Sequence, residues 1–271
     1  MIRINDYLDR LSIIKVLSFF ILVMLVFTLV PIVFNFHLGS LILKFALYGI
    51  MILFFAYKFK KIDLKESHDY SFWTALRNDY DSIFKVADIY HISLIVIANI
   101  LFVCAVYFVL KYLSRLSVIS FDSPLFGEFS SVSISVMVFY FLTIVILSPI
   151  IEEILFRGIF LRRFNKELKN LTLAILISSF LFGICHNFGG ISGAILFGIC
   201  VSILYIKSKN ILVPIFAHFL NNLISFLLAL SGIEYFIQGN PIIIILIIVL
   251  AIVSNFVLFK AIIEEWPTKM I

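Results

Sequence analysis

Charged residues are scarce in this sequence. Asp, Glu, Lys and Arg make up only 14% of its 271 residues, whereas 63% are hydrophobic, and the mean hydropathy is +1.15. These values lie far from those of soluble globular domains and exclude that class. We therefore predict an all-α, polytopic membrane protein, because apolar segments that cross a bilayer must satisfy their backbone hydrogen bonds internally.

Cysteine is also scarce. The three cysteines, Cys104, Cys185 and Cys200, lie inside apolar runs, and their spacing fits neither a disulfide framework nor a metal site. We interpret them as small packing residues. The sequence also lacks an internal repeat, a low-complexity linker and a separate polar domain. A single transmembrane domain over residues 1–271 is therefore the economical prediction.

The net charge of +5 has a membrane explanation. In a soluble chain it would suggest a nucleic-acid ligand, but here the basic residues form short clusters between apolar runs, as the positive-inside rule describes. We predict no nucleic-acid partner. The expected partner is the lipid bilayer, and the expected location is the cell membrane.

Eight apolar runs predict about eight transmembrane helices, at residues 16–36, 38–57, 91–113, 132–160, 171–187, 191–206, 211–230 and 241–259. The first is interpreted as a retained span, because its core is too long for a signal peptide and no small-residue cleavage site follows. Eight crossings place both termini and the strongly basic connections on the cytosolic side. The polar segment 62–90 predicts a helix at the membrane surface, and its Asp79 and Asp81 are interpreted as a solvated acidic pair rather than a metal site.

Three charges interrupt the fourth apolar run, namely Glu152, Glu153 and Arg157 in the stretch Ser148–Gly158. Each costs roughly 2.5–3.5 kcal/mol at the bilayer centre, so these groups must be paired, face a polar interior or do chemistry. On a helix, Glu153 and Arg157 lie about 40° apart and can form an ion pair, whereas Glu152 points about 140° from Arg157. Glu152 is therefore the candidate general base, and Pro149 is expected to kink the helix before it. The alternative is an ion-pair cluster that only holds helices together.

Two later apolar runs carry further polar side chains at i, i+4 spacing, Phe182 with His186 and His218 with Asn222. Helices in a membrane bury polar groups toward one another, so we expect the three sets to converge on one chamber inside the bundle. Residue counts from the cytosolic helix ends put Glu152 and His218 roughly 15 Å and 14 Å deep, but His186 roughly 24 Å deep. His186 is thus expected to lie too deep unless its helix starts late or tilts.

The ordered set Glu152-Glu153-x-x-x-Arg157, Phe182-x-x-x-His186 and His218-x-x-x-Asn222 resembles the three signature motifs of the CPBP (CAAX protease and bacteriocin-processing, or Abi) intramembrane proteases. The type II CAAX prenyl endopeptidases belong to the same family. The resemblance covers residues 140–225, which form the expected catalytic core. It implies hydrolysis of a peptide bond in a hydrophobic peptide or membrane-protein substrate, in peptide-signal or bacteriocin processing or in self-immunity.

The resemblance also implies a role for each motif residue. Glu152 activates a water with help from His186, and His218 and Asn222 stabilise the oxyanion. Glu153 assists while Arg157 holds it, and Phe182 packs against the imidazole. No cofactor is expected, because the sequence lacks a His-Glu-x-x-His helix and Arg157 competes for one carboxylate. A zinc site formed by Glu152, His186 and His218 is the alternative.

Two rival functions remain open. The stretch Gly190-Ile191-Ser192-Gly193 matches the Gly-x-Ser-Gly form of rhomboid serine proteases, with His218 downstream, but it leaves the acidic pair unexplained. Gly190, Ala194 and Gly198 more simply form a stripe for close helix packing. The other rival is a non-proteolytic binding or immunity protein, or an ion-coupled transporter, that uses the same buried carboxylates and histidines as a relay.

Overall fold

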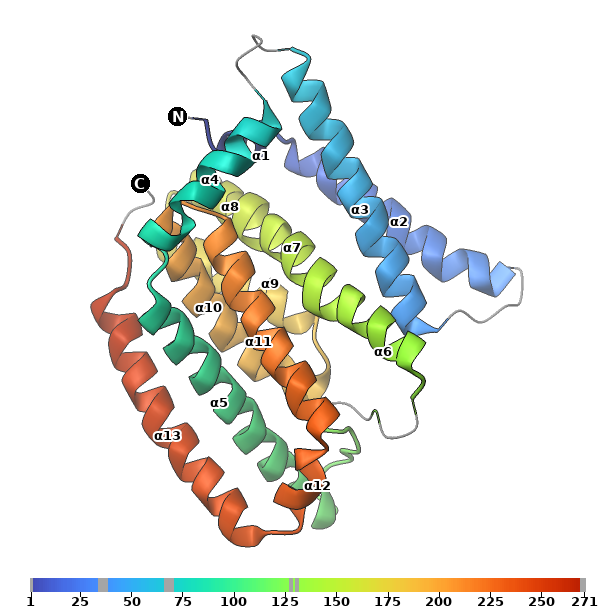
Figure 1. The fold of residues 1–271 in the computed structure, drawn as a ribbon, viewed down its shortest axis with the longest axis vertical. Coiled ribbons are helices and arrows are strands. Elements are labelled where there is room, and N and C mark those ends of the chain that lie inside the picture. The colour runs from blue at the N-terminus through green and yellow to red at the C-terminus, as the bar shows by residue number, and fades with distance from the viewer. Residues whose placement is uncertain (1, 34–38, 66–70, 127–128, 130–131, 269–271) are drawn as a thin grey trace.

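The computed structural model describes residues 2–33, 39–65, 71–126, 129 and 132–268. The described chain contains helices and no strand, which confirms the all-α class (Figure 1). In order, the elements are α1 (Ile4–Asp9), α2 (Ile13–Val33), α3 (Ser40–Asp63), α4 (Phe72–Val86), α5 (Ile89–Arg115), α6 (Ile134–Tyr140), η1 (Phe141–Leu147), α7 (Ser148–Glu153), η2 (Ile154–Leu161), α8 (Arg162–Leu168), α9 (Leu171–Ile184), η3 (Phe188–Gly190), α10 (Ile191–Ser208), α11 (Leu212–Ser231), α12 (Ile233–Gln238) and α13 (Pro241–Glu264).

The described residues include six helices long and apolar enough to cross a membrane, so the protein is a multi-pass helical bundle. They are Leu41–Asp63, Ile89–Arg115, Ile134–Leu168, Phe188–Ser208, Leu212–Ser231 and Pro241–Glu264. Two shorter apolar helices, Ile13–Phe27 and Leu171–Ile184, correspond to the other two predicted spans. Because the 14 residues of α9 extend only about 21 Å, against about 30 Å of hydrocarbon, the count of eight complete crossings stays a prediction.

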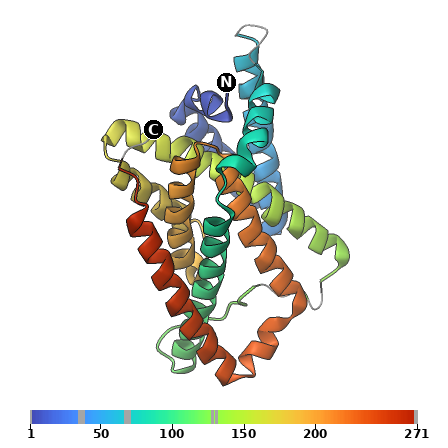
Figure 2. The ribbon, with the colours of Figure 1, turned by 60° about the vertical axis from the view of Figure 1, so that its left-hand side comes forward.

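The two ends of the described chain lie at the same end of the bundle (Figures 1 and 2). This arrangement agrees with the even number of crossings expected from the basic clusters. The side of the membrane that this end faces remains the prediction of the positive-inside pattern.

Helix α10 forms the centre of the bundle and packs against α5, α9 and α11. Close approach to α9 depends on Gly198, because a Cβ atom there would lie 3.0 Å from the Cβ of Ser179. This contact accounts for one member of the predicted small-residue stripe. At Gly190, by contrast, an added Cβ would meet only the His186 Cβ, at 3.9 Å, so that glycine does not mark a tight contact.

The helical stretch Ile134–Leu168 carries the acidic pair. Two π-helical segments, η1 and η2, flank the six-residue helix α7, in which Pro149 is the second residue. Proline removes one backbone donor and crowds the preceding turn, and π-helical segments inside α-helices are rare and frequently lie at functional sites. Glu152 and Glu153 therefore lie on a short α-helical segment between two irregular ones.

The predicted surface helix forms as α4, but one of its acidic residues is not solvated. Asp79 is fully buried and accepts hydrogen bonds from the Ile4 amide at 2.9 Å and from Arg3 at 3.1 Å. Burial raises the pKa of the Asp79 carboxyl above its usual range, although both donors favour the ionised form. Asp81 instead lies at the surface beside Arg77. The prediction of a solvated pair was wrong for Asp79, because this carboxylate ties α1 to α4.

Helices α2 and α3 form a hairpin at the edge of the molecule, with α3 between α2 and the stretch that carries α6 and α7 (Figure 1). Among the described residues, α3 makes the main contacts of this hairpin with the rest of the bundle, at η1, α7 and α4. One face of α3 therefore borders the acidic pair.

Candidate functional site

The carboxylate of Glu152 is held by two hydroxyl groups. Tyr48 of α3 donates a hydrogen bond to Glu152 Oε1 at 2.6 Å, and Ser148, one turn earlier on α7, donates to the same oxygen. Glu152 Oε2 is buried, and no described residue donates a hydrogen bond to it; the same holds for Glu153 Oε2. The Glu152 side chain thus has one anchored oxygen and one oxygen without a donor.

The carboxylate of Glu153 joins Arg157 to His218. Arg157 Nη1 lies 2.8 Å from Glu153 Oε1, as the i, i+4 spacing predicts, and His218 Nδ1 lies 2.8 Å from the same oxygen. Glu153 and Arg157 are both fully buried. The second guanidinium nitrogen of Arg157 donates to the Gly198 carbonyl on α10. Glu153 therefore orients His218 from α11, a link that the sequence did not predict.

His186 follows the last turn of the short helix α9. Its ring nitrogen Nδ1 lies 2.9 Å from the Phe182 carbonyl, and its ring packs against Phe182 with the centroids 4.8 Å apart. A carbonyl only accepts, so Nδ1 carries the proton and Nε2 of a neutral ring is left as an acceptor. The predicted pairing of Phe182 with His186 is present.

The two histidines share one aromatic neighbour. Phe182 also packs edge-on against His218, with the centroids 5.6 Å apart, and the Arg157 guanidinium lies over the same ring at 4.5 Å. Glu152 interacts electrostatically with both histidines. His186 therefore lies close to other motif residues, although the residue count from its helix end predicted that it would lie deeper. Residue counts assume that helices start level and run parallel, which tilted helices of unequal length do not.

Asn222 belongs to a chain of amides. Its Nδ2 donates to the Ile144 carbonyl in η1 at 2.9 Å, and its Oδ1 accepts from Asn221. Asn221 in turn accepts from Asn99 of α5 at 3.0 Å. One hydrogen of the Asn222 amide remains for another acceptor. Asn99 and Asn221 had no part in the sequence prediction, although Asn221 adjoins a motif residue.

A cavity of about 240 Å³ brings these side chains together. Its lining includes His186, His218, Asn222, Asn221 and Asn99, with apolar walls from residues such as Tyr140 and Phe226. Glu152 does not line this cavity, and its hydroxyl partners lie toward α3. The predicted chamber inside the bundle is thus present, with the candidate base beside it rather than in its wall.

The alternative zinc site finds no support in the arrangement of donors. Within the described part of the chain, no three His, Cys, Asp or Glu side chains are grouped so that they could hold a metal ion. Glu152 Oε1 and the Nδ1 atoms of His186 and His218 have protein partners. A metal-bound histidine usually makes such a bond through its second ring nitrogen, so these contacts do not decide the question and the zinc alternative stays a prediction.

The rhomboid reading is not supported either. Ser192 is exposed at the start of α10, whereas His218 is buried and bonds to Glu153. A serine protease needs its serine within hydrogen-bond reach of a base.

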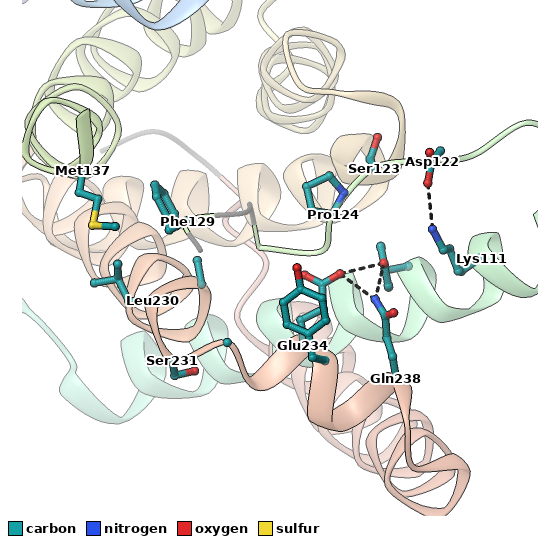
Figure 3. Close-up of a pocket in the computed structure, with 14 residues that line it drawn as sticks. Lys111, Asp122, Ser123, Pro124, Phe129, Met137, Leu230, Ser231, Glu234 and Gln238 are labelled. Carbon is teal, nitrogen blue, oxygen red and sulfur yellow. Dashed lines mark hydrogen bonds and ion pairs between the residues drawn. The ribbon is translucent and has the colours of Figure 1, made fainter. Parts of the chain in front are cut away.

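A larger cavity, of about 410 Å³, lies where α5, α11 and α12 meet the segment after α5 (Figure 3). Its centre is Glu234, which accepts from Tyr107 at 2.9 Å, from Gln238 at 2.8 Å and from the Leu125 amide at 3.0 Å. Both oxygens of this carboxylate are thus engaged. No motif residue lines the cavity, and Glu234 serves to hold the segment after α5 against α12.

Comparisons with known proteins support the resemblance of the segment that carries the three motifs. Residues 134–224 match a family model described as "Type II CAAX prenyl endopeptidase Rce1-like", which confirms the predicted resemblance over the part that carries all three motifs. The chain is also 35% identical over 96 residues to a Bacillus subtilis (strain 168) protein named "Putative membrane peptidase YdiL". That match covers 34% of this chain and 38% of the relative, so it spans well under half of either protein. No solved structure matches the chain significantly.

Proposed function

We propose that this protein is an intramembrane endopeptidase, on the premise that its motif-bearing segment is similar to the Rce1-like endopeptidases. The environment of Glu152 carries the proposal. One oxygen is anchored by two hydroxyls, the other is buried without a donor, and both motif histidines are in electrostatic range. A buried carboxylate oxygen without a partner is a site where a water molecule can bind. A water bound there would contact the carboxylate that can act as its general base.

In the proposed reaction, Glu152 Oε2 takes a proton from this water while the water oxygen bonds to the scissile carbonyl carbon. His186 Nε2 accepts the other hydrogen of the water, because Nδ1 bonds to the Phe182 carbonyl. The tetrahedral intermediate then breaks its C–N bond, and Glu152 returns the proton to the departing nitrogen. The products are a carboxylic acid and an amine, so no cofactor enters the balance.

The oxyanion of the intermediate needs donors that are already in place. We assign this role to His218 and to the remaining amide hydrogen of Asn222. His218 donates through Nδ1 to Glu153, so donation from Nε2 to the substrate requires both ring nitrogens to carry protons. Glu153 and Arg157 would hold the ring in this orientation, and the Ile144 carbonyl would hold the Asn222 amide.

The substrate class follows from the surroundings of the site. The lining of the chamber includes amide side chains and aromatic rings, which suits a peptide backbone with apolar side chains. A hydrophobic peptide or membrane protein is therefore the proposed substrate. Peptide-signal or bacteriocin processing, or self-immunity, is the physiological role that the family resemblance suggests.

The proposal is tested with purified protein in liposomes that contain hydrophobic peptides, in ¹⁸O-labelled water. Hydrolysis places one ¹⁸O atom in the new carboxyl group, which mass spectrometry detects. We expect the label with wild-type protein, equally with Ser192→Ala and equally after treatment with a zinc chelator. Loss of the label in Ser192→Ala would favour the rhomboid mechanism, and loss with the chelator would favour zinc. If no labelled product forms and the same liposomes show substrate-dependent ion flux, the transporter function would be favoured over the protease.

Tyr48 is expected to be a positioning residue for Glu152. We expect Tyr48→Phe to lower kcat about tenfold with KM unchanged, because a hydrogen bond to a charged group contributes about 1.5–3 kcal/mol and Tyr48 does not line the cavity proposed for the substrate. Tyr57→Phe on the exposed part of α3 is the matched control and should have no effect. Ser148→Ala added to Tyr48→Phe should cost more than the two single effects combined, since both hydroxyls serve one oxygen. Additive effects would show that the two hydroxyls act independently.

A further inference from the structure

Five cationic residues surround a third cavity, at the base of the α2–α3 hairpin. The cavity encloses about 220 Å³, and its lining includes Arg10, Lys15, Lys58, Lys61 and Lys65. They come from three segments, because Arg10 follows α1, Lys15 lies in the first turn of α2, and the other three lie at or after the end of α3. Positive charge is thus gathered from separate parts of the chain around one hollow.

Two of these lysines share a face of α3. Lys58 and Lys61 are spaced i, i+3, so they lie about 60° apart around the axis, and Lys65 follows the end of the helix at Asp63. Like charges at this spacing repel one another and destabilise the helix. Their arrangement is therefore one that an anion in the cavity would relieve.

No acidic side chain lines this cavity in the described part of the chain. Two acidic residues beside these segments have other partners. Asp63 accepts hydrogen bonds from Tyr7 and from the Phe72 amide, and Asp9 pairs with Arg162. These two carboxylates therefore do not balance the charge of the four lysines in the lining.

Two neighbouring features indicate what kind of anion would fit. Ser12, Lys15 and Val16 of the lining lie at the N-terminus of the 21-residue helix α2, where the first backbone N–H groups have no acceptor within the helix. Beside the cavity, α2 and α3 expose apolar side chains, among them Ile14 at 73% and Leu53 at 70% exposure. An anionic head group would thus lie next to a surface suited to acyl chains.

We propose that this cavity binds the phosphate head group of an anionic phospholipid, with the acyl chains along the exposed faces of α2 and α3. Phosphate chemistry alone would also admit a free phosphate compound. The apolar faces beside the cavity favour the lipid, because a soluble anion would make no use of them. The inference is independent of the protease proposal.

The test measures lipid binding by the full-length protein in neutral detergent. Fluorescence anisotropy follows chain-labelled phosphatidylglycerol, with chain-labelled phosphatidylcholine as the neutral lipid. The test variant carries Lys58→Gln, Lys61→Gln and Lys65→Gln. The control variant carries Lys166→Gln, Lys169→Gln and Lys209→Gln, three exposed lysines that do not line the cavity, so both variants lose the same charge.

We expect the wild-type and control proteins to bind phosphatidylglycerol more tightly than phosphatidylcholine, and the cavity variant to lose about tenfold or more of that affinity with an unchanged melting temperature. Equal weakening in both triple variants would overturn the proposal, because it would show that only net charge matters. In a third arm, pyrophosphate alone is titrated by calorimetry. Binding of pyrophosphate as tight as that of the lipid would overturn the lipid assignment.

The cavity variant could be replaced by the single variant Lys61→Gln, in an exposed position, if the triple substitution lowers the melting temperature. An affinity of Lys61→Gln for phosphatidylglycerol equal to that of the wild type would then overturn the site.

Discussion

Replacing Glu152 by Gln is expected to lower the rate of peptide hydrolysis by about 10²- to 10⁴-fold, the usual contribution of a positioned general base. Gln keeps an oxygen that can accept from Tyr48 and Ser148, so the local packing should survive. It cannot take a proton from water at neutral pH. The loss should therefore appear in kcat, with little change in KM or in melting temperature.

The measurement is the ¹⁸O-labelled product formed per unit time by equal amounts of folded protein. Glu167→Gln is the matched control, because Glu167 is an exposed carboxylate farther along the same helical stretch and pairs with Arg163. We expect this control to retain full activity. A Glu152→Gln protein with wild-type turnover would remove Glu152 from the mechanism and leave the acidic pair as a structural cluster. The same substitution in cells should also change the set of released peptides.

The fold class was predictable because it depends on local composition. Apolar runs set the helices, and the helix starts lie within a few residues of the predicted starts. One of the helix ends is instructive. Hydropathy extends the fifth run to residue 187, but α9 ends at Ile184, and His186 lies in the turn. The turn contains apolar residues such as Cys185, so hydropathy does not mark where the helix stops.

Within the site, contacts along one helix were predictable and contacts between helices were not. The Glu153–Arg157 and Phe182–His186 pairs follow from i, i+4 spacing. Ser148 stands at the same spacing before Glu152, so that hydrogen bond had a visible signal. Tyr48 had none, because it lies 104 residues earlier, in a helix outside the matched segment.

The sequence also contains a signal for the importance of Glu234, an isolated charge in an apolar region. It is the one acidic residue between Glu167 and Glu264, in an otherwise apolar part of the sequence. A charge in such a place needs a partner. Apart from Gln238, its partners are Tyr107 and two backbone amides of the segment after α5, which lie far away in the sequence. Position alone could indicate that Glu234 matters for the fold, but not what it holds.

Replacing Arg157 by Met is expected to destabilise the protein by about 3–5 kcal/mol, because it leaves the Glu153 charge buried without its main partner. The exposed fraction of both side chains is 0%, and the two groups lie 2.8 Å apart. Arg163→Met is the matched control on the same helical stretch. Arg163 also pairs with a glutamate at i, i+4, at 2.9 Å, but these side chains are 46% and 58% exposed, so about 0–1 kcal/mol is expected. The free energy of unfolding in mixed micelles gives both values.

Adding Glu153→Gln to Arg157→Met separates the charge from the other contacts of the arginine. Both variants lose the hydrogen bond to the Gly198 carbonyl and the contact with the Phe182 ring, so these losses cancel in the comparison. The double variant no longer buries an unpaired carboxylate, and Gln can still accept from His218. We therefore expect the double variant to be more stable than Arg157→Met alone. If instead the second substitution lowers stability further, the arginine contributes mainly through packing against α9 and α10, and the ion pair is not what keeps this helix in place.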